Sequence, residues 1–184
     1  YTLDEIANDI TRETRAAFEP AIDYVVVKIP RFDFEKFPGT DDRLTTAMKS
    51  VGETMAIGRT FGEALQKGLR GLETGATGAF DPRLEPMSDG ELSDRLETAT
   101  PGRIHLVVEA LRRGWPVERV RVATGIDPWF LHQLDGLIHE AARHAELDPE
   151  TLDGPGWRRI KSANRPGWLL SSSYEPAWTS RPAM

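Results

Sequence analysis

The sequence contains no cysteine and no long apolar run. Without thiols there can be no disulfide framework, no thiolate zinc site and no cysteine nucleophile. No apolar stretch approaches the roughly 20 residues that a membrane-spanning helix needs, and the first residues lack the basic and apolar regions of a secretory signal peptide. We therefore expect a cytoplasmic protein without a membrane partner. Because the chain begins with tyrosine in place of methionine, we also expect a fragment or a processed product.

Basic residues are in deficit, since 23 Lys and Arg stand against 29 Asp and Glu, for a formal net charge of -6. A general nucleic-acid binder needs excess lysine and arginine to displace counterions from phosphates. The charge balance therefore argues against a nucleic-acid partner. With 184 residues, 39% hydrophobic and 28% charged, the chain has the ordinary composition of a globular protein with one domain or two small ones.

The most informative stretch is residues 49–59, KSVGETMAIGR. Read with the period of a strand, it has an apolar face around one carboxylate, and its opposite face is nearly bare, so that a backbone or helix can approach closely. A carboxylate among apolar side chains is costly to remove from water unless it is paired. Glu53 is therefore the candidate functional residue, and an edge-strand glutamate that reaches solvent or an arginine is the alternative. The two faces are Lys49, Val51, Glu53, Met55 and Ile57, and Ser50, Gly52, Thr54, Ala56 and Gly58.

The first 80 residues predict an incomplete α+β unit. Residues 2–6 have the pattern of a short capped helix, and residues 22–29 predict an internal strand, covered on both faces and closed by Pro30. Thr60 and Glu63 form a capping box before a helix with a leucine stripe. Two strands and so few helices cannot complete a sheet covered on both faces. Three aromatic residues between basic ones are typical of a packing plug, with a nucleobase-stacking platform as the alternative; they are Phe32, Phe34 and Phe37.

The second part of the chain predicts a compact all-α region. Glycines and prolines within residues 71–86 predict a helix end, a domain boundary and a linker, and the glycine run lacks the Lys-Ser/Thr ending of a phosphate-binding loop. Short helical patterns follow, and the last of them has Asp127 as N-cap and Pro128 at the first helical position. The predicted helices are residues 91–99, 104–111, 117–123 and 128–145.

Two motifs in this region allow sharper interpretations. Residues 113–130 have the pattern of a DNA-binding helix-turn-helix. The second helix would begin with Trp129-Phe130-Leu131, however, and these side chains suit burial better than contact with base edges. His139 and His144 nearly complete a zinc-protease motif, but a spacing of i+5 rotates the second histidine off the face shared by residues i and i+4. We therefore expect no metal ligands here and keep DNA binding as a distant alternative.

Residues 151–184 change character, because prolines interrupt any helix and the tryptophans follow no period. Such a composition predicts an irregular tail that is non-native or disordered. A reading-frame disruption near Asp153 would produce it, and we state this as a hypothesis that the sequence of the source gene would decide.

Two runs, YVVVKIPRF at 24–32 and DRLTTAMKSVGE at 42–53, resemble the large subunit of carbamoyl-phosphate synthase. The resemblance continues through 59–78 and more loosely through 103–134, where it includes TGIDPWFL. It implies that residues 1–80 are the C-terminal part of the first ATP-grasp (carboxyphosphate) domain, that 81–150 are a helical oligomerisation domain, and that the family pattern is lost in 151–184. The expected fold class is thus α+β, an incomplete ATP-grasp piece followed by an all-α domain.

The family is an ATP-dependent ligase that makes carbamoyl phosphate from bicarbonate, ammonia and ATP for arginine and pyrimidine biosynthesis. The resemblance implies three partners: the rest of the large subunit, the glutamine amidotransferase small subunit that supplies ammonia, and further copies joined through the helical domain. ATP with Mg or Mn belongs to residues upstream of the position matching Tyr1. The resemblance therefore implies no catalytic, cofactor-binding or metal-binding residue here and predicts that the chain alone is inactive.

The resemblance assigns one site role, since the glutamate that matches Glu53 faces the interior passage that conveys carbamate from the first active site to the second. The alternative function is a non-catalytic helical interaction module.

Overall fold

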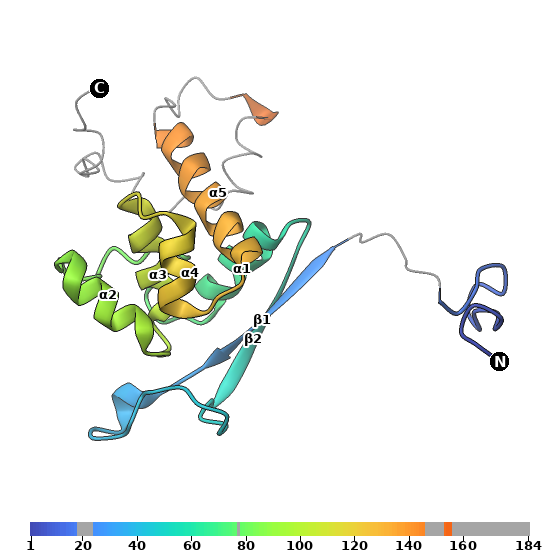
Figure 1. The fold of residues 1–184 in the computed structure, drawn as a ribbon, viewed down its shortest axis with the longest axis horizontal. Helices are drawn as coiled ribbons and strands as arrows, with labels where there is room; N and C mark the ends of the chain where they lie inside the picture. The colour runs from blue at the N-terminus through green and yellow to red at the C-terminus, as the bar shows by residue number, and fades with distance from the viewer. Residues whose placement is uncertain (18–23, 77, 146–152, 156–184) are drawn as a thin grey trace.

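The computed structural model describes residues 1–17, 24–76, 78–145 and 153–155 (Figure 1). They form a small antiparallel sheet of two strands and five α-helices, in agreement with an α+β class. Most of the predicted irregular tail lies outside the described residues. The elements are β1 (Val25–Arg31), the 3-10 helix η1 (Phe34–Lys36), β2 (Gly52–Gly58), α1 (Phe61–Gly71), α2 (Asp89–Glu97), α3 (Arg103–Arg112), α4 (Val117–Thr124) and α5 (Pro128–Ala145).

The two strands form a long hairpin whose register runs from Val25 opposite Gly58 to Arg31 opposite Gly52. The prediction that Pro30 closes the first strand is wrong, because Pro30 pairs with Glu53 inside the ladder. An edge strand tolerates proline, since an N–H on its open side would have no ladder partner. The prediction of an internal strand is also not met. Within the described residues β1 has only β2 as a neighbour, and its side chains alternate between half-buried and exposed.

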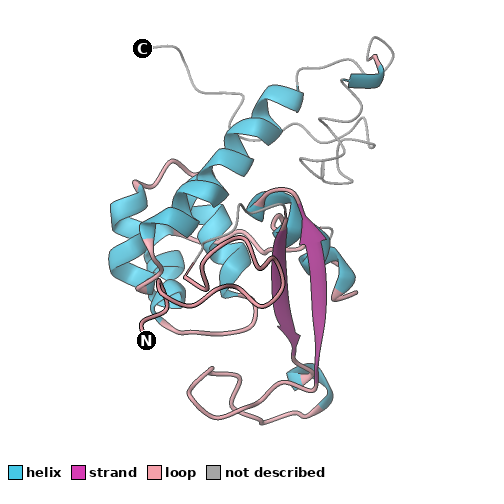
Figure 2. Cartoon of the chain, turned by 90° about the vertical axis from the view of Figure 1, so that its right-hand side faces the viewer, coloured by secondary structure: helices cyan, strands magenta, loops and turns pink. Residues whose placement is uncertain are grey.

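Helix α1 packs against the bare face of the hairpin (Figure 2). A Cβ added at Gly68 would lie 2.8 Å from Ile29 Cδ1, and one at Gly71 would lie 2.8 Å from Thr54 Cγ2. At Gly58 an added Cβ would lie 2.7 Å from the backbone nitrogen of Ala64. The small side of the helix thus meets the small face of the strand, and the predicted close approach is confirmed.

Helices α2 to α5 gather on the other side of α1, and one continuous hydrophobic core joins them to it. Leu65 and Leu69 of α1 belong to this core together with Leu92, Val107 and the fully buried Leu131. Ser88 caps α2 by accepting a hydrogen bond from the Glu91 amide, so the helix begins two residues before the predicted start. None of the helices in the described residues combines the length and apolarity needed to cross a membrane.

The linker between α1 and α2 is hydrogen-bonded to α1 and to α3. The backbone N–H of Ala79 donates to Gln66 Oε1 at 2.6 Å, and the carbonyl oxygen of Ala79 lies 2.9 Å from His105 Nδ1. Ala79 and Ala76 are themselves buried. The predicted boundary at residues 80 and 81 therefore lies within a continuous core, and the division into segments stays a prediction.

The short helix predicted at residues 2–6 is wrong. The capping-box contact is present, since the Thr2 amide donates to Glu5 Oε2 at 2.8 Å, but the backbone makes only a turn. An isolated bridge joins Ala7 to Arg15. One turn cannot offset the cost of helix nucleation without a surface to pack on.

Candidate functional site

The candidate residue Glu53 stands on the outer face of β2, the face turned away from α1. Its Oε2 lies 2.9 Å from the Nζ of Lys28 on β1, and the two side chains are 56% and 60% exposed. Lys28 pairs with Met55 in the ladder, so the ion pair crosses the strands diagonally. The structure therefore gives Glu53 a cationic partner and access to solvent. Both are features of the edge-strand alternative, with lysine in the place of arginine.

The side chains that flank Glu53 along β2 are apolar and exposed. Val51, Met55 and Ile57 are 61%, 67% and 54% exposed, and Val26 on β1 is 44% exposed. An exposed apolar face of this kind on a sheet marks a contact surface or the wall of a ligand-binding groove. The sequence predicted the composition of this face. Its exposure arises because α1 covers the opposite face of the hairpin, while these side chains stay accessible among the described residues.

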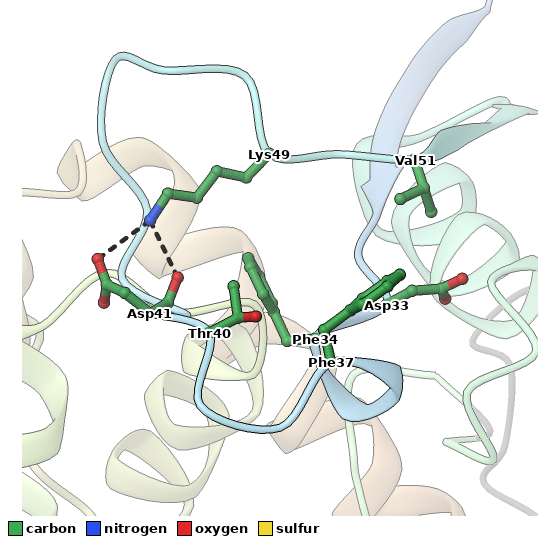
Figure 3. Close-up of a pocket in the computed structure, with 7 residues that line it drawn as sticks. All are labelled: Asp33, Phe34, Phe37, Thr40, Asp41, Lys49 and Val51. Carbon is green, nitrogen blue, oxygen red and sulfur yellow. Dashed lines mark hydrogen bonds and ion pairs between the residues drawn. The ribbon is translucent and has the colours of Figure 1, made fainter.

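A cavity of about 330 Å³ lies beside this face, between η1 and the loop that leads to β2 (Figure 3). Phe34, Phe37 and Val51 supply apolar walls. Lys49 Nζ closes the loop, because it donates to Asp41 Oδ2 at 3.1 Å and to the carbonyl oxygens of Asp41 and Arg43 at 3.0 and 2.7 Å. Sequence reasoning placed Lys49 on the strand, whereas it precedes β2 and anchors the loop. A lysine among nearby aspartates is the signal that could have indicated this.

The basic residues around the three phenylalanines are bonded to acidic neighbours. Arg31 Nε donates to Asp33 Oδ1 at 3.1 Å, and Lys36 Nζ donates to Asp33 Oδ2 at 2.6 Å. The bond from Lys36, assisted by Arg31, holds the pKa of Asp33 below its usual range. The rings of Phe32 and Phe34 stack at 5.6 Å on each other. These contacts favour the packing plug over a nucleobase platform, because the cations that would meet phosphates are already engaged.

No cluster of three or more His, Cys, Asp or Glu side chains suited to a metal ion occurs in the part of the chain that the structure describes. His139 Nδ1 lies 2.9 Å from the carbonyl oxygen of Asp135 one turn earlier, and His105 is bonded to the linker. The side chain of His144 lies outside the described residues.

Sequence reasoning missed Gln66, which is 1% exposed and joins α1 to the linker through Ala79. Its Nε2 has no hydrogen-bond partner among the described residues. The periodicity of the helix does not decide the burial of Gln66. At about 100° per residue this side chain lies between the leucine stripe and the polar strip of Glu63, Lys67 and Arg70.

Comparison with known proteins assigns the family. Residues 53–164 match the family described as "Carbamoyl-phosphate synthetase large chain, oligomerisation domain". A carbamoyl phosphate synthase large chain from Mycobacterium sp. (strain JLS) is 53% identical over 163 residues, which are 89% of this chain and 14% of the relative. The chain belongs to the carbamoyl-phosphate synthase large-chain family.

Two further relatives show how much of the large chain is covered. The large chain of Xanthomonas axonopodis pv. citri is 46% identical over 192 residues, which are 100% of this chain and 18% of the relative. A protein of Aquifex aeolicus named "Carbamoyl phosphate synthase large chain, N-terminal section" is 53% identical over 173 residues, which are 93% of this chain and 30% of the relative. The chain thus spans less than a third of the length of these relatives.

The family match begins at Glu53, within β2, and therefore includes α1 with the helices that follow. It ends at residue 164, beyond Asp153. The hypothesis of a reading-frame disruption near Asp153 stays a prediction.

Proposed function

We propose that the chain is a section of the first half of a carbamoyl-phosphate synthase large subunit, in which the outer face of the hairpin lines the passage for carbamate. The observation that carries this proposal is the exposed apolar face around the Lys28–Glu53 pair. The name of the Aquifex relative, an N-terminal section, supports the placement in the first half.

The chemistry of the face suits transit better than reaction. Carbamate is a small anion, and an unpaired carboxylate in the wall would repel it. Because Lys28 neutralises Glu53, the wall carries no net charge there. The apolar neighbours offer no hydrogen bonds that would hold the anion in place. The role that we assign to Glu53 is lining and gating, with no bond-making.

In this proposal Mg-ATP is held outside the chain, and no step of phosphoryl transfer is assigned to its residues. The nucleotide-binding and metal-binding residues of the first ATP-grasp domain lie in the rest of the large subunit in this proposal. The small subunit that releases ammonia from glutamine is a further partner.

The test replaces Glu53 with alanine in the complete large subunit, assembled with its small subunit. Bicarbonate-dependent ATP hydrolysis is expected to stay near the wild-type rate, whereas coupled formation of carbamoyl phosphate falls, because carbamate leaks or stalls in the passage. Glu35→Ala is the matched control, since Glu35 is also exposed and pairs with one arginine at 3.5 Å. The 184-residue chain alone is expected to hydrolyse no ATP in the same assay.

If both activities of the Glu53→Ala enzyme fell in parallel and its melting temperature dropped, the residue would be structural and the proposed passage role would be refuted. Bicarbonate-dependent ATP hydrolysis by the chain alone would refute the proposed lack of activity.

The second function that we propose is assembly, in which helices α2 to α5, which we call the helical unit, join copies of the large subunit. The description of the matched family as an oligomerisation domain supports it. Sedimentation equilibrium of the chain over a range of concentrations tests it, and a strictly monomeric profile at high concentration would refute it.

A further inference from the structure

Three aromatic side chains form a cluster where α1 and α5 begin. Phe61 is the first residue of α1, and Trp129 and Phe130 lie in the first turn of α5. The centroid of the Phe61 ring lies 5.4 Å from those of both Trp129 and Phe130, and the last two rings meet edge to face at 5.0 Å. We call these three residues the aromatic patch.

The aromatic patch is exposed although its rings pack on one another. Trp129 is 53% exposed and Phe130 is 44% exposed, whereas the next residue, Leu131, is fully buried. The sequence suggested that Trp129, Phe130 and Leu131 are all buried, and this is correct for Leu131 only. In the described part of residues 88–145, the large hydrophobic side chains that are exposed are Trp129, Phe130 and Val122 of α4. Trp129 and Phe130 are the two of these that contact each other, and they form an exposed apolar surface on the helices.

We propose that the aromatic patch is the surface through which two copies of this chain meet, an inference that rests on the proposed role of the helical unit in assembly. The matched oligomerisation family spans all three residues. Tryptophan and phenylalanine are enriched in the cores of protein interfaces, and a few such residues carry most of the binding free energy.

The backbone beneath the aromatic patch is fixed before any partner arrives. Asp127 Oδ1 accepts a hydrogen bond from the Trp129 amide at 2.8 Å, and the Asp127 carbonyl oxygen accepts one from Phe130 at 3.1 Å. Gly125 ends α4 in a left-handed conformation that directs the chain into this turn. A rigid surface loses little conformational entropy on binding.

Two carboxylates close in sequence to the aromatic patch are bonded within the chain. Asp127 Oδ1 accepts the hydrogen bond from the Trp129 amide at 2.8 Å, and Glu63 Oε1 forms an ion pair with Lys67 Nζ at 2.6 Å. In a two-fold interface the same patch of each copy meets its counterpart, so an unpaired charge would tend to face a like charge. Internal pairing removes this repulsion and fits a second copy as the occupant.

The test measures self-association of the 184-residue chain by sedimentation equilibrium. The double variant Trp129→Ser with Phe130→Ser is expected to raise the dissociation constant at least about tenfold, because each change occurs twice in a symmetric interface. Met55→Ser is the control, since Met55 is a large apolar residue that is even more exposed, at 67%, but lies on the hairpin. This variant is expected to leave the constant within about twofold.

Hydroxyl-radical footprinting of the wild-type chain gives a second readout that needs no variant. Oxidation of Trp129 and Phe130 is expected to fall as the chain associates, while the buried Trp115 stays unreactive at every concentration. Footprinting of the complete large subunit, diluted until it is monomeric, decides between a second copy and another part of the same subunit.

Each other outcome overturns a specific statement. A chain that is monomeric throughout would overturn both the assembly proposal and this one. Association that survives the double variant, or that only Met55→Ser weakens, would leave assembly standing and overturn the role of the aromatic patch. Protection of Trp129 in the monomeric large subunit would overturn it too, because the rest of the same subunit would then cover these rings.

Discussion

Replacing Gly58 with alanine tests how closely α1 packs on the hairpin. Gly58 is the last residue of β2 and is buried. A Cβ built there lies 2.7 Å from the backbone nitrogen of Ala64 and 3.1 Å from both Ala64 Cα and Glu63 Cβ. Two of these atoms are backbone, so no side-chain rotation relieves the clash. The helix must instead move away from the strand.

That movement has a cost that follows from the packing. A gap of about 0.5–1 Å forfeits a quarter to a half of each van der Waals contact across it, and overpacking of this kind costs about 1–3 kcal/mol. Alanine also lowers the conformational entropy of the unfolded chain, which offsets about 0.4–1 kcal/mol of this cost. We therefore expect Gly58→Ala to lower the free energy of unfolding by about 1–2 kcal/mol.

Gly52→Ala is the matched control at the other end of β2. No atom lies within 4 Å of a Cβ built at Gly52, so only the unfolded-state term applies, and the free energy of unfolding should stay the same or rise by about 0.5 kcal/mol. Urea unfolding followed by circular dichroism measures both variants. Equal midpoints for Gly58→Ala and Gly52→Ala would refute the close packing of α1 on β2.

Two further predictions concern the helical unit and the linker. Burial alone would raise the pKa of Glu109, but hydrogen bonds from Arg112 and Arg113 outweigh it and hold that pKa below its usual 4.5. The stability that these bonds provide is present above pH 4.5 and is lost as pH falls toward the lowered pKa. The free energy of unfolding should therefore decline from about pH 6 to about pH 3, and it should decline less steeply in Glu109→Gln. The same pH dependence in both proteins would contradict the lowered pKa of Glu109. Gln66→Leu removes the acceptor of the buried Ala79 amide. This variant should lower the free energy of unfolding by about 1–2 kcal/mol and speed hydrogen exchange at that amide, whereas the control Gln133→Leu on α5 should do neither. Unchanged exchange at Ala79 in Gln66→Leu would contradict the role of Gln66.

The local elements could be predicted from the sequence because each has its own period. The helices at 61–71, 117–124 and 128–145 follow from capping residues and apolar spacing, and the two faces of β2 follow from strict alternation. The helix prediction for residues 2–6 is wrong because the capping-box contact forms there without a helix. A cap stabilises a helix but does not supply the packing surface that a single turn needs.

Contacts between distant segments had no periodic signal to reveal them. Gln66 reaches Ala79 across 13 positions, and His105 reaches Ala79 across 26. Lys49 bonds to a loop that only its folded path brings near. The aromatic patch is similar, since Phe61 meets Trp129 and Phe130 only after α1 and α5 pack. For the candidate site, the sequence could predict that Glu53 sits among apolar neighbours, but Lys28 as its partner required the strand register.

Helix α1 connects the two surfaces to which we assign functions. Its glycine side packs on the hairpin that carries Glu53, its leucine side belongs to the core of the helical unit, and its first residue, Phe61, belongs to the aromatic patch. Close-packed helices move as units, because interiors at crystal-like density do not deform continuously. A second copy bound at the aromatic patch would therefore fix the position of α1 and, through Gly58 and Gly68, the position of the hairpin. If copies meet at the aromatic patch, one helix links assembly to the position of the hairpin face around Glu53. In the complete large subunit with its small subunit, the double variant Trp129→Ser with Phe130→Ser should then alter both the oligomeric state and the coupling of ATP hydrolysis to carbamoyl phosphate formation.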